Sequence, residues 1–184
     1  MSTIDYAKLK DDYVWYVSYG SNMLRERFMK YIEGGSFEGG GANHVPCADT
    51  SAPLEVKTFD IPYDMYFRNA STVWGGKGVS YLDIAKAGHA HGVAYLITRA
   101  QFEHVACQEN GGNPPAKSPG RYNTVLKVGT MDGLDVVTIT NDETCNFNPP
   151  SEAYLTTLKR GMQENYTDMS EEEIDRYLQG CIRA

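Results

Sequence analysis

The chain has 184 residues, 41% of them hydrophobic, and a formal net charge of −7 at pH 7. This length and apolar content are enough for one compact core, so we expect a single domain over residues 1–184. The negative charge, with no basic block anywhere in the chain, argues against nucleic acid as a partner because phosphate binding needs a basic surface.

Two further features bear on location. The longest apolar run, residues 93–97, is far too short to cross a bilayer, so no membrane partner is expected. Residues 1–12 lack the pattern of a secretory signal, which predicts a cytoplasmic protein. The cysteines lack metal-type spacing and the density of a disulfide scaffold, so reduced thiols are expected.

The chain begins its regular structure in residues 14–32. Residues 14–19 are β-branched and aromatic, which predicts a buried strand. Gly20 can end that strand sharply, and Ser21 is a good N-cap for a following helix. The apolar positions of that helix recur at helical spacing: Leu24, Phe28 and Ile32.

The loop between this strand and helix is a candidate anion site. It consists of Tyr19, Gly20, Ser21 and Asn22. The first N–H groups of a helix have no intrahelical partner, so they can hold a carboxylate or an oxyanion.

Residues 34–60 predict a long loop, because glycine, proline, asparagine and aspartate interrupt any regular pattern. Residues 54–59 are a short strand candidate within it. Two more strands are expected at 65–67 and 78–82, on either side of a glycine-rich turn that follows Trp74.

Residues 91–98 give the clearest buried strand. Thr98 and Gln101 then form a capping box that opens a helix. Asparagine, glycine and proline in residues 108–115 end that helix, which places Glu109 at a helix end that faces a loop.

The rest of the chain predicts a hairpin and two helices. Residues 122–128 and 134–140 are its strands, joined by residues 129–133. Ser151 caps the first helix, and a capping box of Ser170 and Glu173 opens the second. The expected fold is α+β: a mixed sheet or small barrel flanked by helices.

The strand and loop at 16–23, with Tyr-Gly-Ser-Asn at its centre, resemble the signature of the γ-glutamylcyclotransferase-like family, also called BtrG-like. In that family a strand of the type Gly-Val-x-Tyr leads to the catalytic glutamate, and here residues 92–95 lead to Glu109. Asn110 stands where many members carry glycine, and asparagine also tolerates the left-handed conformation. The enlarged 34–60 loop and the aliphatic Val137 depart from the family pattern and leave the substrate open.

The resemblance implies an enzyme without cofactor or metal that acts on a small γ-glutamyl compound. The substrate's α-amino group attacks its own γ-carbonyl, which releases 5-oxoproline and an amine or amino acid. Glu109 is then the general base and acid. Tyr19, Gly20, Ser21, Asn22 and Tyr122 bind the substrate, and residues 111–120 could close over it. A monomer or a homodimer is expected.

Other classes of protein stay open. A cysteine hydrolase would need a thiolate with a histidine partner, and Cys107 with His104 is the nearest pair. His89 and His91 share one face of a strand, but no carboxylate or thiolate lies at ligand spacing, so no metal site is expected. A module of the same fold that binds a small molecule without turnover is the main alternative.

Overall fold

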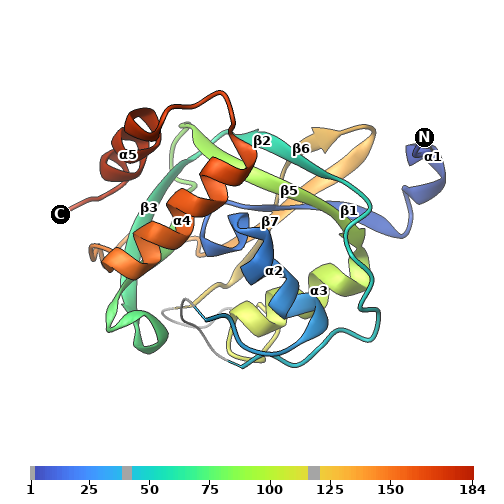
Figure 1. Cartoon of the computed structure of the whole chain (residues 1–184), viewed down its shortest axis with the longest axis horizontal. Helices are drawn as coiled ribbons and strands as arrows, with labels where there is room; N and C mark the ends of the chain where they lie inside the picture. The colour runs from blue at the N-terminus through green and yellow to red at the C-terminus, as the bar shows by residue number, and fades with distance from the viewer. Residues whose placement is uncertain (1–2, 39–42, 116–120) are drawn as a thin grey trace.

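The chain folds into a curved mixed β-sheet with helices packed against it (Figure 1). The computed structural model describes residues 3–38, 43–115 and 121–184. The N-terminal elements are α1 (Tyr6–Leu9), β1 (Tyr13–Ser18), the 3₁₀ turn η1 (Ser21–Met23), α2 (Arg25–Glu33), β2 (Val56–Ile61), β3 (Asp64–Ser71) and the 3₁₀ turn η2 (Thr72–Trp74). Then follow β4 (Lys77–Asp83), β5 (Ala90–Thr98), α3 (Arg99–Glu109), β6 (Thr124–Met131), β7 (Leu134–Thr140), α4 (Glu152–Asn165) and α5 (Glu171–Gly180).

β1 is the central strand of a five-stranded sheet with the order β2-β5-β1-β7-β6. It runs antiparallel to β5, with Tyr16 opposite Tyr95, and parallel to β7, with Tyr16 opposite Val137. β3 and β4 form a separate antiparallel pair. The prediction of an α+β fold with a mixed sheet is therefore confirmed.

The alternative of a small barrel is wrong, since no ladder joins the edge strands β2 and β6 in the described part of the chain. The two edges meet through side chains instead. Lys57 Nζ on β2 lies 2.9 Å from Asp132 Oδ2 in the turn after β6, and the ring of Phe59 packs over Gly129. A barrel closes only when its edge strands share backbone hydrogen bonds, and a register shift in β6 between Lys127 and Gly129 interrupts the regular edge.

Aromatic side chains hold α2 and α3 against the sheet. The rings of Phe28 on α2 and Tyr95 on β5 stack with centroids 3.9 Å apart, and Phe102 on α3 lies 5.8 Å from Tyr16. Such rings bury large apolar areas and dominate core energetics. The packing brings the end of β1, the start of α2 and the end of α3 to one place.

Most predicted elements of the second half are confirmed. β5 covers the strand predicted at 91–98, and the Thr98–Gln101 and Ser170–Glu173 capping boxes are both present. Ser151 caps α4 through a bond from Tyr154 N. No helix in the described chain is long and apolar enough to span a membrane.

Three local predictions differ from the structure. The hairpin turn is Asp132 and Gly133, not residues 129–133, because both residues adopt positive φ (54° and 78°) and so make a tight turn. The strand predicted at 54–59 is β2, and its pairing with β5 moves its end to Ile61. Ser21 caps no helix: η1 intervenes, and α2 begins after Leu24 without a side-chain cap.

Candidate active site

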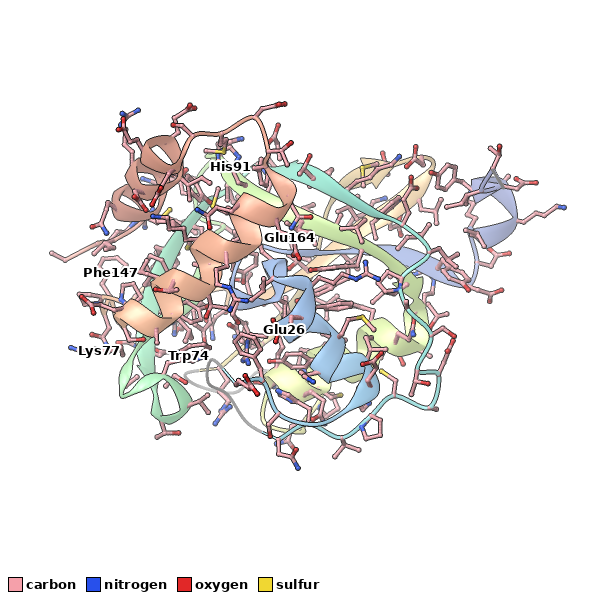
Figure 2. The ribbon with its side chains drawn as sticks, viewed as in Figure 1. Glu26, Trp74, Lys77, His91, Phe147 and Glu164 are labelled. Atoms are coloured by element: carbon pink, nitrogen blue, oxygen red, sulfur yellow. The ribbon has the colours of Figure 1, made fainter. Side chains whose placement is uncertain are left out.

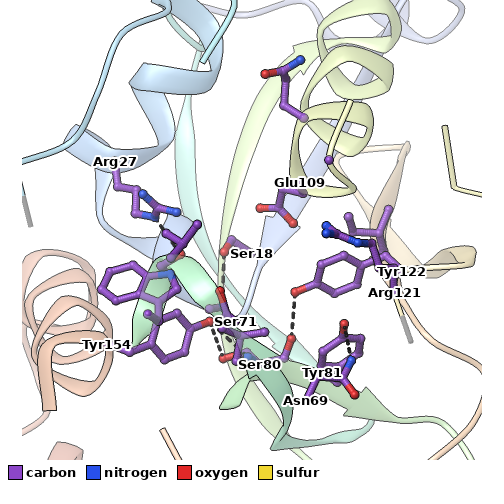
Figure 3. A pocket seen from close by; sticks show the side chains of 18 of the residues that line it. Ser18, Arg27, Asn69, Ser71, Ser80, Tyr81, Glu109, Arg121, Tyr122 and Tyr154 are labelled. Atoms are coloured by element: carbon purple, nitrogen blue, oxygen red, sulfur yellow. Dashed lines mark hydrogen bonds between the residues drawn. The ribbon is translucent and has the colours of Figure 1, made fainter. Parts of the chain in front are cut away.

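A cavity of about 410 Å³ lies beside the end of β1. Its walls come from the loop after β1, the end of α3, and strands β4 and β7. Figure 3 shows Glu109 pointing into this space, with Arg27 and Arg121 on two sides of it. The volume is within the usual range for small-molecule sites.

Glu109 is the last residue of α3, and the chain turns away directly after it. Gly111 and Gly112 have φ values of 69° and 90°, and Gly112 N donates to Cys107 O over 2.8 Å. Asn110 itself has φ −105°, so the left-handed conformation expected there is at Gly111 instead. The sharp ending leaves the Glu109 side chain directed at the cavity rather than along the helix.

Two donors hold one oxygen of the Glu109 carboxylate. Asn22 Nδ2 donates to Oε1 over 2.5 Å, and Tyr16 Oη donates to the same atom over 3.2 Å. Tyr95 Oη in turn donates to the backbone carbonyl of Asn22 over 2.6 Å. Among the described residues no donor is bonded to Oε2, so that oxygen is available for a substrate.

Burial raises the pKa of Glu109 to about 7, although nearby Arg27 and the hydrogen bonds from Tyr16 and Asn22 act in the opposite direction. A carboxyl group with this pKa exchanges its proton readily near neutral pH. Strong perturbation of this kind in a cavity is typical of functional residues.

The loop after β1 faces the same cavity. Tyr19, Gly20 and Ser21 line it, and the backbone N–H groups of Ser21 and Asn22 have no acceptor within the described chain. A Cβ at Gly20 would lie 3.0 Å from Tyr154 Oη and 3.1 Å from Ser80 Cβ, so a side chain there fits only if these neighbours shift. The loop therefore presents its backbone to the cavity.

The side chains of this loop bond to other parts of the protein. Asn22 is 1% exposed and does not line the cavity, since its amide holds Glu109. The Tyr19 hydroxyl donates to Ile139 O over 2.6 Å. Ser21 Oγ accepts from Arg27 Nε over 2.9 Å. Tyr122 lines the cavity as expected, with its hydroxyl donating to Ser80 O over 3.1 Å.

Among the cavity residues that sequence reasoning missed are Arg27, Ser80, Arg121 and Tyr154. Arg27 carries the one signal that could have been read, a cation one helical turn before Tyr31 on a face that is otherwise apolar. Its guanidinium is buried and lies 5.2 Å from the centroid of the Trp74 ring. Ser80 lies on β4, Arg121 in the loop before β6 and Tyr154 on α4, and only the tertiary structure brings these three together.

The Cys107–His104 pair lies outside the cavity, and the predicted 111–120 lid is described only in part. Residues 116–120 of the predicted 111–120 lid lie outside the described residues, as do residues 39–42 of the long loop. His104 Nε2 is 2.7 Å from Val45 O, and neither His104 nor Cys107 lines the cavity.

Sequence comparison identifies one partial relative. No family model matches the chain. It is 30% identical over 203 aligned positions to Histone deacetylase 5 of Arabidopsis thaliana, an alignment that covers 92% of this chain and 31% of that protein. The chain thus spans less than a third of that relative, and the relative's activity belongs to a much longer protein.

Solved structures give the class of fold. An uncharacterized protein from Homo sapiens superposes with a TM-score of 0.60 at 20% identity, over 93% of this chain and 88% of that one. A structure named gamma-glutamyl cyclotransferase gives 0.59 at 19% identity with the same coverage. YkqA from Bacillus subtilis gives 0.57 at 17% identity, over 97% of this chain and 58% of that one.

The chain therefore has the γ-glutamyl cyclotransferase fold. At these identities the likeness establishes the fold, and the resemblance inferred from the Tyr-Gly-Ser-Asn loop is confirmed at that level. The reaction and its substrate rest on the site.

Proposed function

We propose that the protein is a γ-glutamylcyclotransferase-like enzyme that needs no cofactor. It converts the γ-glutamyl part of a small substrate into 5-oxoproline and releases the attached amine or amino acid. The observation that carries the proposal is Glu109, a carboxyl group with a pKa of about 7 that lines a cavity beside the unbonded backbone N–H of Ser21. The shared fold supports the same class of reaction.

The substrate contains its own nucleophile, so the enzyme has to fold it and move protons. Intramolecular attack held in the right geometry can reach effective molarities on the order of 10⁵ M or more. The backbone N–H group of Ser21, which lines the cavity, can hold either the substrate's α-carboxylate or the oxyanion that develops on the γ-carbonyl.

Glu109 performs both proton transfers in this scheme. Its Oε2 takes a proton from the α-ammonium group, and the freed amine attacks the γ-carbonyl carbon to close a five-membered ring. The bond from that carbon to the leaving nitrogen then breaks as Glu109 gives its proton to that nitrogen. The ring nitrogen loses its second proton through the same carboxylate to the released amine, which leaves as its ammonium ion. Glu109 ends in its starting state, and no water is consumed. Tyr16 and Asn22 fix the carboxyl group from the other side through Oε1.

The charges that line the cavity favour a leaving group with a carboxylate. Arg27 and Arg121 both line it, and Glu109 is the one acidic residue among the described residues that do so. A γ-glutamyl amino acid or peptide carries two carboxylates, one for each guanidinium, whereas a γ-glutamyl alkylamine carries one. We therefore expect γ-glutamyl amino acids or peptides to be the better substrates.

The test is release of 5-oxoproline, measured by mass spectrometry, from a panel of γ-glutamyl amino acids, γ-glutamyl amines and glutathione. Glu109→Gln keeps the shape of the side chain and removes its proton transfer, so we expect a loss of about 10²–10⁴-fold in kcat. Arg121→Ala should lower kcat/KM for γ-glutamyl amino acids more than for γ-glutamyl alkylamines.

A folded Glu109→Gln protein that retains full activity would exclude the role given to Glu109. If the native protein makes no product from any panel member, while one of them raises the melting temperature, the chain is the binding module considered as the alternative. If Arg121→Ala lowers kcat/KM equally for all substrates, the expected preference for γ-glutamyl amino acids is wrong, but the reaction assigned to Glu109 is unaffected.

A further inference from the structure

A second cluster of ligand-type side chains lies at the edge of the sheet, outside the cavity around Glu109. Asp60 on β2 pairs directly with His91 on β5, and His89 lies two positions before His91 on the same face. Ligand atoms of the three residues all lie within 4.8 Å of one another. None of the three lines the cavity around Glu109.

From this geometry we propose that Asp60, His89 and His91 form a binding site for a divalent transition metal ion, with zinc as the preferred occupant. The Asp60 Oδ1 atom lies 3.1 Å from His89 Nε2 and 3.9 Å from His91 Nδ1. Ligand atoms on a tetrahedral zinc ion, at bond lengths of about 2.0–2.2 Å, lie about 3.3–3.6 Å apart. One of the two observed distances is slightly shorter than this range and the other slightly longer.

His91 is held in place before any ion binds. Its ring lies between Tyr166, with centroids 5.0 Å apart, and Tyr177, at 4.6 Å. Its Nδ1 atom is buried and has no hydrogen-bond partner among the described residues. This nitrogen is too far from the Asp60 carboxylate for a hydrogen bond, and a cation bound between the two groups would give it a partner. Figure 2 shows His91 beside the C-terminal helices.

The donor set indicates which ion fits. Two imidazole nitrogens and one carboxylate oxygen suit zinc and its first-row neighbours better than magnesium or calcium, which prefer oxygen ligands. The side chains of Asp60 and His89 are 72% and 53% exposed, so water can reach the fourth position. β2 is the edge strand of its sheet, and we expect the ion to stabilise the β2–β5 pairing.

The experiment uses the full chain without an affinity tag, freed of metal by dialysis against a chelator. Zinc binding is measured by isothermal titration calorimetry, and the melting temperature is measured with and without zinc. The site variants are Asp60→Asn, His89→Gln and His91→Phe, the last of which keeps an aromatic ring between Tyr166 and Tyr177. His104→Gln is the matched control for a histidine outside the cluster.

We expect one zinc per native chain and a melting temperature that rises with zinc concentration, since the ion binds the folded state. Removal of a residue that only hydrogen-bonds to a metal ligand costs about 10–100-fold in metal affinity. Removal of a ligand itself should therefore lower the zinc affinity of each site variant at least about tenfold. His104→Gln should bind like the native chain.

The cysteine thiols could bind zinc in place of the proposed site, and cobalt substitution distinguishes the two kinds of ligand. Cobalt bound by a thiolate gives a charge-transfer absorption in the near ultraviolet that nitrogen and oxygen ligands do not give. That band, or a loss of zinc binding in Cys107→Ser or Cys145→Ser, would overturn the proposal. Absence of saturable zinc binding, or equal affinity in the native chain and all three site variants, would overturn it as well. None of these readouts depends on turnover at Glu109.

Discussion

At the scale of single residues, the site depends on the balance of forces on Glu109. Burial favours the neutral acid, while Arg27, Tyr16 and Asn22 favour the carboxylate, and the pKa comes to about 7. A free glutamate would be a weak base at neutral pH because its usual pKa is 4.5. The surroundings of Glu109 thus supply what its residue type lacks, and Asn22 contributes to them from a distant part of the sequence.

The pH dependence of activity follows from this pKa. If Glu109 must be a carboxylate to take the first proton, kcat/KM rises as the pH increases through about 7 and then levels off, apart from any ionisation of the substrate. Between pH 5 and pH 6 the rise should approach tenfold. Initial rates of 5-oxoproline formation from pH 5 to pH 9 check this. A profile already flat above pH 5 would show that the group in use has an ordinary carboxyl pKa.

Tyr16→Phe tests the donors on Glu109 Oε1. Removal of a hydrogen bond to the charged form raises the pKa of Glu109, so the pH profile moves upward. We expect kcat/KM to fall by about 3–10-fold at pH 6, with a smaller loss above pH 8. Tyr166→Phe is the matched control, since its hydroxyl donates to Gly92 O away from the cavity. A loss that is equal at every pH would indicate a purely structural role for the Tyr16 hydroxyl.

At the scale of elements, the position of the loop after β1 depends on α4. Gly161 in the middle of α4 packs directly on η1, where a Cβ would lie 2.6 Å from Leu24 N and 2.7 Å from Met23 C. Further along α4, Asn165 Nδ2 donates to Met23 O over 3.2 Å. The helix therefore supports the backbone that presents N–H groups to the cavity, although α4 follows that loop by more than half the chain.

Gly161→Ala tests the close contact between α4 and η1. Without that contact, a change from glycine to alanine would be expected to stabilise the helix. The added methyl group meets backbone atoms, so we expect a loss of about 1–3 kcal/mol in the free energy of unfolding, with lower kcat/KM. Gly180→Ala is the matched control on α5, where nothing lies within 4 Å of the new Cβ. That change should be neutral or stabilising by up to about 1 kcal/mol. Urea unfolding of both variants measures the difference, and equal stabilities would refute the close-packing argument.

At the scale of the whole molecule, separate parts of the chain meet at buried polar contacts as well as in the core. Asp83 at the end of β4 is 4% exposed, and its Oδ2 lies 2.8 Å from Arg183 Nη1. Burial by itself would raise the pKa of Asp83, but hydrogen bonds from Arg183, Ala85 N and Thr144 hold that pKa below its usual value of 3.8. The contact fixes the segment after α5 to the two-stranded sheet.

Asp83→Asn should lower the free energy of unfolding by about 1–3 kcal/mol at pH 6. A depressed pKa in the folded state stabilises the fold above pH 3.8, and that contribution is lost as the pH falls below it. The difference in the free energy of unfolding between the native chain and the variant should therefore be smaller at pH 3. Urea titrations at both pH values measure it, with Asp168→Asn as an exposed control that stays within about 0.5 kcal/mol of the native chain. A difference that does not depend on pH would contradict this account.

The sequence by itself determined the features that depend on neighbours along the chain. The capping box at Thr98, the end of α3 at Glu109 and the strand at 91–98 each follow from residues a few positions apart, because caps and strand patterns are local. The Tyr-Gly-Ser-Asn loop likewise pointed to the fold that the solved structures share.

The contacts between residues far apart in the sequence were decided only by the tertiary structure. The edges of the sheet meet by side chains and not by a ladder, the Asn22 amide holds Glu109, and Asp60 comes to lie beside His89 and His91. Each of these contacts joins residues far apart in sequence, and strand register and helix packing bring them together. Register and packing are set by the whole core at once, so no local pattern contains them.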